Sequence, residues 1–488
     1  EVFADGSITS AGDGIELGGG TVSFTGTIDS SQSSGIYVQG VGEVFAAGDI
    51  TAAQQGISLG AGSVEFSGTI NSEFSDGIYV AGVGQVTGAG SISAAGDGIE
   101  IGSGTVEFNG DITSGFSNGI YIVGDGQVQG AGSITASQHG IQLASGSVLY
   151  SGTVISYFAD GIHIDGEGQV FVTGLVQGGG DGIELGSAFV SVDGDVTAQF
   201  GNGVLVNGAG IVAVSGNIQA PQAGIQLAGD GIVDFEGSIE AGIVGIEGGS
   251  GSQQVMVDGT INAPIAVRLG DDGDTLYVAR ESRISGEIRM DGGDDTVQIG
   301  GGAVIVDTIY GGETGETLGD LLLIGDGQIC SEDLEAVASA RAIADIDPNA
   351  NVISFQGQVY PWAEFERIAS GSYFNPCVGS INDGRVNRND LGAPNALYCI
   401  VGGGVSVWEI DLNGQGSFSF AVTQQQFEAA LAQAASSGAN TLVASDNFGN
   451  SFHALSDGQT IAFIAPDLRE PGKNYEFTFG RSFCAASA

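Results

Sequence analysis

Basic residues are almost missing from this 488-residue sequence. It contains 11 Lys and Arg against 58 Asp and Glu, which gives a formal net charge of −47. No Lys or Arg occurs before Arg268, and Lys473 is the only lysine. Such a surface cannot displace counterions from a phosphate backbone, so we expect no nucleic acid and no anionic membrane among the partners.

Long hydrophobic runs are missing too. No stretch of 18 or more apolar residues occurs, so we expect no membrane-spanning helix. The first six residues carry neither the basic nor the hydrophobic segment of a signal peptide. Since the composition is that of an exported protein, we expect an extracellular or bacterial cell-surface location after removal of a signal peptide.

Cysteine is scarce and confined to the last third of the sequence. The four cysteines match no metal-ligand spacing such as CxxC. In an exported domain they predict two disulfides, and three pairings remain open. The residues are Cys330, Cys377, Cys399 and Cys484.

Glycine is abundant, with 88 residues against 8 prolines, and it marks an internal repeat. A Gly-Ile or Gly-Val dipeptide recurs at a constant 21-residue spacing without insertion, which identifies a repeat architecture. The opening glycines are Gly14, Gly35, Gly56, Gly77, Gly98, Gly119, Gly140, Gly161, Gly182, Gly203, Gly224 and Gly245.

Each repeat predicts three short strands separated by glycine-rich corners, because apolar residues alternate with polar ones. This pattern favours an all-β, single-chain parallel β-helix, with Ile15 and its successors stacked inside. The second strand begins alternately eight and nine residues after the opening glycine, as at Val22 and Val44. The sequence therefore predicts 21-residue coils in a 42-residue super-repeat, and fifteen coils would span roughly 70 Å. We expect the opening glycines to have a positive φ.

A polar residue precedes most opening glycines, as at Asp76, Asp97, Asp160 and Asp181. We expect a corner ladder in which these side chains bond to neighbouring backbone groups. Carboxylates one coil apart repel each other, so the pairs also favour a proton or a cation.

Two sets of aromatic residues recur on alternate repeats. One set, with a histidine in its fourth place, points outward from the first strand, and the other lies in a corner. Both could stack on sugar rings or lie against a neighbouring rod, although aromatics also pack well on β surfaces, and a corner Phe could fold inward. The outward set is Tyr37, Tyr79, Tyr121 and His163, and the corner set is Phe74, Phe116, Phe158 and Phe200.

No catalytic constellation stands out, so we expect no enzyme. A polyuronate lyase would need a cation or an Arg near its base, and the first twelve coils have neither Arg nor Lys. His139, His163 and His453 are scattered along the sequence and suggest neither a Ser/His/Asp site nor a metal site. A glycan lyase or hydrolase is the least favoured function.

The repeat degrades near residue 266, where two Asp/Gly segments follow each other one coil apart. They resemble the Ca²⁺-binding nonapeptides of RTX-type exported proteins, which implies a possible Ca²⁺ cofactor, and dense Asp oxygens suit Ca²⁺. Nearby arginines offer ion pairs as the alternative. The candidate ligands are Asp271, Asp272, Asp274, Asp291, Asp294 and Asp295.

Beyond the repeat we expect two further units. Residues 330–371 predict a helix from Ser331, then strand, turn and short helix over 351–366, which together close the β-helix. Residues 372–488 predict a small disulfide-bonded α+β or β-rich domain. Its expected strands are 405–410, 417–422, 441–444, 460–464 and 475–479, with a helix over 424–435.

The repeat over 1–329 and the closing segment resemble secreted bacterial β-helix surface proteins, including adhesins and autotransporter-type passengers. The sequence starts mid-coil, and an uncovered solenoid end is adhesive. We therefore expect, first, a filament subunit that forms a head-to-tail homopolymer. The alternative is an adhesin that binds an extracellular glycan through the outward aromatic stripe, which is Tyr37, Tyr79, Tyr121 and His163. The candidate assembly residues are Val2, Ala4, Ile8, Trp408, Phe418 and Phe420.

Overall fold

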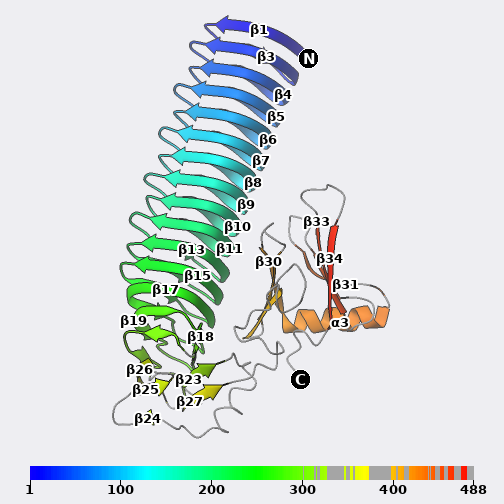
Figure 1. The fold of residues 1–488 in the computed structure, drawn as a ribbon. Coiled ribbons are helices and arrows are strands. Elements are labelled where there is room, and N and C mark those ends of the chain that lie inside the picture. The colour runs from blue at the N-terminus through cyan, green and yellow to red at the C-terminus, as the bar shows by residue number, and fades with distance from the viewer. Residues whose placement is uncertain are drawn as a thin grey trace.

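Residues 1–300 wind into a continuous parallel β-helix, part of a stack of about 15 coils that forms the long rod of Figure 1. This confirms the predicted all-β solenoid and its 21-residue coil. The computed structural model describes residues 1–300, 302–312, 315, 319–326, 346–347, 352–355, 358–365, 367–372, 397–402, 405–411, 417–437, 439, 441–445, 451–454, 460–466 and 474–480.

The strands of the rod run through the corners in most coils, so that one strand often covers nearly a whole coil. They are β1 (Val2–Ser10), β2 (Ile15–Leu17), β3 (Gly20–Ser30), β4 (Ile36–Ala52), β5 (Ile57–Ser72), β6 (Ile78–Ala94), β7 (Ile99–Ser114), β8 (Ile120–Ala136), β9 (Ile141–Ser156), β10 (Ile162–Gly178), β11 (Ile183–Ala198), β12 (Val204–Val206), β13 (Gly210–Ala220), β14 (Ala223–Leu227), β15 (Gly231–Ala241), β16 (Val244–Gly248) and β17 (Gln253–Arg268).

The register of strand pairing repeats every two coils, as predicted. Residues of the first strand pair at the constant coil spacing, as Ile36 with Ile57. Residues of the second strand step by 22 and then 20, as Val22 with Val44 and Val44 with Val64. The register shifts at the intervening corner, where one residue is moved from one corner to another on alternate coils.

The same period organises the core. One internal column alternates large and small residues, so that an aromatic ring of one coil fills the space above a small residue of the next. Phe66 and Phe108 are almost completely buried on either side of Gly88, which pairs with both of them. The column contains Phe24, Ala46, Phe66, Gly88, Phe108, Gly130 and Tyr150.

The predicted positive φ of the opening glycines is wrong, because the left-handed glycines lie at other positions of the coil. Gly26, Gly48 and Gly68 there have φ values of +130°, +143° and +133°. The opening glycines are required by close packing instead. A Cβ at Gly35 would lie 2.3 Å from Cγ2 of Ile50 and 2.6 Å from the carbonyl oxygen of the next opening glycine.

Beyond β17 the strands shorten but the parallel stacking continues. β26 pairs with β22, and β27 pairs with β23, so the stack resumes after an insertion. β26 also takes the place of the short helix predicted there, which was wrong, and the helix predicted from Ser331 lies outside the described residues. The strands are β18 (Thr275–Val278), β19 (Arg283–Arg289), β20 (Thr296–Gly300), β21 (Val304–Ile305), β22 (Ile309–Tyr310), β23 (Leu321–Asp326), β24 (Ile346–Asp347), β25 (Val352–Phe355), β26 (Gln358–Ala363) and β27 (Arg367–Ser372).

The described residues between 397 and 480 form two antiparallel sheets, β28–β30 and β31–β34, and a helix near the predicted positions, and β28 and β32 were not predicted. No helix that the structure describes is long and apolar enough to cross a membrane. The elements are β28 (Leu397–Gly402), β29 (Val405–Asp411), β30 (Ser417–Thr423), α3 (Gln424–Ser437), β31 (Thr441–Ser445), β32 (Ser451–Ala454), β33 (Thr460–Pro466) and β34 (Asn474–Gly480).

Candidate functional site

The residues before the opening glycines form the predicted corner ladder. Oδ1 of Asp76 accepts a hydrogen bond from the backbone N–H of Asp97 at 2.8 Å, and Oδ1 of Asp97 accepts one from the N–H of Asn118 at 2.8 Å. The pattern continues with Asn118, His139 and Asp160 as acceptors. Each side chain thus satisfies a backbone donor at a corner, where the strand ladder is interrupted.

The predicted outward residues of the first strand form a second column. Parallel pairing places Tyr79 beside Glu100 and Glu100 beside Tyr121, and these side chains are half-buried. From the first coil the column runs through Glu16, Tyr37, Ser58, Tyr79, Glu100, Tyr121, Gln142, His163 and Glu184, and it continues into the later coils. Its tyrosines are therefore separated by single polar residues.

The corner ladder and the outward column meet in two acidic triads, which occupy equivalent positions four coils apart. In each triad the carboxylate oxygens lie within 4.8 Å of one another. In the first triad, burial and the charges of Asp76 and Asp97 raise the pKa of Glu100 to about 7. The triads are Asp76, Asp97 and Glu100, and Asp160, Asp181 and Glu184.

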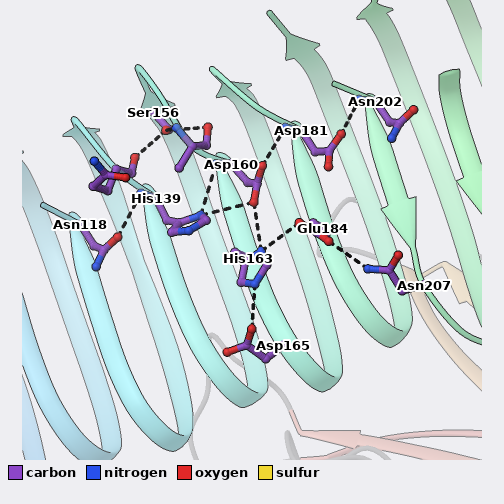
Figure 2. A network of polar contacts seen from close by, with 12 residues as sticks. Asn118, His139, Ser156, Asp160, His163, Asp165, Asp181, Glu184, Asn202 and Asn207 are labelled. Atoms are coloured by element: carbon purple, nitrogen blue, oxygen red, sulfur yellow. Dashed lines mark hydrogen bonds and ion pairs between the residues drawn. The ribbon is translucent and has the colours of Figure 1, made fainter. Parts of the chain in front are cut away.

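Two histidines join the second triad and form a polar network (Figure 2). Nδ1 of His163 lies 3.0 Å from Oδ2 of Asp160 and 3.2 Å from Oε2 of Glu184, and Nε2 lies 2.9 Å from Oδ1 of Asp165. The ring of His139 lies 4.7 Å from that of His163, and its Nδ1 lies 3.4 Å from the same Asp160 oxygen. We call His139, Asp160, His163 and Glu184 the histidine cluster.

Charge is divided unequally within the histidine cluster. Hydrogen bonds that His163 donates to the carboxylates of Asp160 and Glu184 raise its pKa to about 10, whereas burial lowers the pKa of His139. The hydrogen bond to His163 lowers the pKa of Glu184 to about 2. In residues 2–267, where the sequence has no Lys or Arg, an imidazolium is the only available side-chain cation.

The expectation that the histidines are scattered is therefore wrong for two of them. His139 and Asp160 are neighbours in the corner ladder, and His163 follows Asp160 by three residues in the same coil. The constant spacing of the repeat already contained this adjacency. The adjacency is not obvious from the sequence, because the corner ladder and the outward column are separate patterns. Both nevertheless lie at the start of the first strand of each coil.

The four corner phenylalanines point into solvent. Their exposed fractions are 68% for Phe74, 81% for Phe116, 77% for Phe158 and 69% for Phe200, so the alternative that they fold inward is wrong. Each backbone N–H donates to the carbonyl of a small residue in the preceding coil, at 2.9–3.1 Å. We call these four residues the Phe column, and the small residues are Ala53, Ala95, Ser137 and Gly179.

The Asp-rich coils separate their candidate ligands. Asp274 and Asp295 are buried, whereas Asp271, Asp272 and Asp291 are exposed. Among the described residues, the six aspartates form no group of three with ligand atoms within 4.8 Å. Two of the nearby arginines form ion pairs with glutamates, Arg268 with Glu247 and Arg289 with Glu287. Ca²⁺ binding at these coils stays a prediction.

Asp274 forms part of a buried ladder. Its Oδ1 accepts a 2.6 Å hydrogen bond from the N–H of Gln253, and its N–H donates to Oδ1 of Asp295 at 2.7 Å. Its Oδ2 is buried without a hydrogen-bond partner. Burial, followed by the charge of Asp295 and other acids, raises the pKa of Asp274 to about 9.

The candidate assembly residues lie in two places. Val2, Ala4 and Ile8 of β1 are only partly buried against the core. In the C-terminal sheet of β28–β30, Trp408 pairs with Phe420, and Phe418 pairs with Ile410, although their side chains lie outside the described part. The predicted disulfides also lie outside it, because only the backbone of Cys399 is described.

No family model, curated protein or solved structure matches this chain.

Proposed function

We propose that the chain is an extracellular or cell-surface binding protein without catalytic activity, whose rod holds an extended polysaccharide along the Phe column. The observation that carries the proposal is the exposure of all four Phe rings, at one corner of alternate coils. Exposed apolar rings in solvent cost free energy, and regular spacing favours a partner with a matching repeat.

The spacing of the Phe column and the charge of the chain restrict which polymer the rod can hold. Two coils advance by about 9.6 Å, since neighbouring strands lie about 4.8 Å apart, and a disaccharide of an extended β-1,4-linked chain has a similar length. The formal charge of −47 disfavours a polyanion. Neutral glycans such as cellulose or chitin therefore fit best, with sugar faces stacked on the rings.

The Phe column supports binding better than the tyrosine stripe, because Tyr37, Tyr79 and Tyr121 are half-buried between polar neighbours. It also supports binding better than catalysis. The acidic triads recur at equivalent positions within a regular ladder, whereas a hydrolase needs one acid and one base of different character.

The test is retention on insoluble cellulose, chitin and mannan. Wild type should be retained on at least one polymer, and Phe74→Ser/Phe116→Ser/Phe158→Ser/Phe200→Ser should lose retention while keeping its circular dichroism. Val41→Ser/Val83→Ser is the matched control, because these valines are also about 70% exposed but lie at another corner. Equal retention of both variants, or no retention of wild type, would contradict the proposal.

Head-to-tail assembly is a second proposal. Val2, Ala4 and Ile8 of β1 are partly exposed, whereas their partners Val22, Phe24 and Ile28 in β3 are buried. Another copy, through its proposed disulfide-bonded α+β domain at 372–488, could cover this face, as could chain preceding residue 1. Electron microscopy of the purified chain distinguishes these two ways of covering the face. Filaments support assembly, and single rods at high concentration contradict it.

A further inference from the structure

We propose that the histidine cluster, His139, Asp160, His163 and Glu184, binds one divalent transition-metal ion, with Zn²⁺ as the reference ion. Asp160 follows Phe158 of the Phe column by two residues, but no Phe ring belongs to the cluster, and the proposal does not depend on polysaccharide binding. Two imidazoles and two carboxylates form a donor set that suits Zn²⁺ better than Ca²⁺ or Mg²⁺, which prefer oxygen alone.

Three donor pairs already have the spacing that a tetrahedral site needs, and His139, Asp160 and His163 each offer a ligand atom within 4.8 Å of the others. Bonds of about 2.0–2.2 Å around Zn²⁺ place neighbouring ligand atoms about 3.4 Å apart. Oδ2 of Asp160 lies 3.4 Å from Nδ1 of His139 and 3.0 Å from Nδ1 of His163. Nδ1 of His163 lies 3.2 Å from Oε2 of Glu184. A metal ion would thus take the place of the proton on Nδ1 of His163, which lies between the carboxylates of Asp160 and Glu184.

Outer contacts hold the ligands in position, as in established metal sites. Nε2 of His163 contacts Oδ1 of Asp165 at 2.9 Å, which orients the ring. Oε1 of Glu184 accepts a hydrogen bond from Nδ2 of Asn207 at 2.9 Å. Oδ1 of Asp160 accepts one from the backbone N–H of Asp181 at 2.7 Å, so Oδ2 remains directed to the histidines (Figure 2).

The bound state requires one contact to change. Nδ1 of His139 now accepts a 3.2 Å hydrogen bond from the N–H of Asp160, and coordination would use that lone pair. This bond is at the long end of the normal range, so its loss is the smallest change that admits an ion. The competing explanation is that His163 serves only as an imidazolium that neutralises Asp160, Asp165, Asp181 and Glu184.

The chain contains an internal control for these two explanations. Gln55 and Tyr79 occupy, in the first triad, the positions that His139 and His163 occupy in the second, four coils later. The carboxylates are equivalent, as Glu100 and Glu184 show. If the imidazoles are required for binding, wild type should have one such metal site. A second should form when the equivalent residues are placed in the first triad.

The experiment is titration of the full chain, free of any polyhistidine tag and stripped with chelator, with ZnCl₂ by calorimetry and with CoCl₂ by visible absorption. We expect one Zn²⁺ per chain and the absorption of tetrahedral Co²⁺. His139→Gln and His163→Gln should each weaken binding at least about tenfold. Glu100→Gln in the first triad should leave it unchanged, and Gln55→His/Tyr79→His/Ala81→Asp/Val123→Asn, which also supplies counterparts of Asp165 and Asn207, should add a second ion.

Thermal melts check that each variant folds. Absence of saturable Zn²⁺ binding would overturn the proposal, as would binding that survives both His139→Gln and His163→Gln. Failure of this four-residue variant to bind a second ion, although folded, would also contradict it, because the donor set and its outer contacts together would then be insufficient.

Discussion

Gly48→Ala should destabilise the rod by at least about 3 kcal/mol. A Cβ at this position would lie 2.0 Å from the carbonyl oxygen of Gly26 and 2.9 Å from its nitrogen, both of them backbone atoms of the preceding coil. Gly48 also has a φ of +143°, which L-residues rarely adopt. The coils cannot separate without breaking the parallel ladder, so the clash has no local relief.

Gly12→Ala is the matched control, because a Cβ there meets no atom within 4 Å and its φ is not in the left-handed region. Its free energy of unfolding should stay within about 0.5 kcal/mol of wild type. Urea denaturation followed by circular dichroism measures both variants. A Gly48→Ala variant as stable as Gly12→Ala would mean that the glycine ladder does not set the close approach of the coils.

Asp274→Asn should stabilise the chain by about 2–5 kcal/mol at pH 8. The pKa of buried Asp274 is raised to about 9, so the folded protein keeps a proton that the unfolded chain releases near pH 4. Wild-type stability from this group is therefore complete below pH 4 and falls as pH rises toward 9. Asn keeps the acceptor for the N–H of Gln253 but carries no charge.

Urea denaturation at a series of pH values, with Ca²⁺ and with chelator, measures this effect. In chelator, the advantage of Asp274→Asn should grow from pH 4 to pH 9. If Ca²⁺ binds these coils, it replaces the proton, so Ca²⁺ should abolish the pH dependence of wild type. A constant difference between the proteins at every pH in chelator would show that Asp274 is not protonated in the fold.

The architecture could be predicted because the repeat is exact and its chemistry is local. Alternating residues from Ile15 onward determine which side chains face inward, and the eight- and nine-residue offsets at Val22 and Val44 determine the register. The glycine conformations could not be predicted, because two glycine ladders satisfy different needs. Gly35 avoids the side chain of Ile50, whereas Gly48 adopts a positive φ.

The candidate sites divide in a similar way. The corner ladder followed from residue type and spacing, but the exposure of Phe116 did not, because a corner side chain can turn either way. To predict the histidine cluster, two spacings must be combined: the one-coil step from His139 to Asp160 and the three-residue step from Asp160 to His163. The burial of Asp274 was also hidden, since an Asp-rich segment predicts exposed ligands.

The most direct test of the proposed function is the dissociation constant for a soluble oligosaccharide of the retained polymer as Phe rings are removed one at a time. Each ring from Phe74 to Phe200 should contribute to binding. For an oligosaccharide long enough to span the column, affinity should therefore fall about three- to tenfold per Phe→Ser change. Val41→Ser should have no effect. An affinity that stays constant through removal of all four rings would contradict the account.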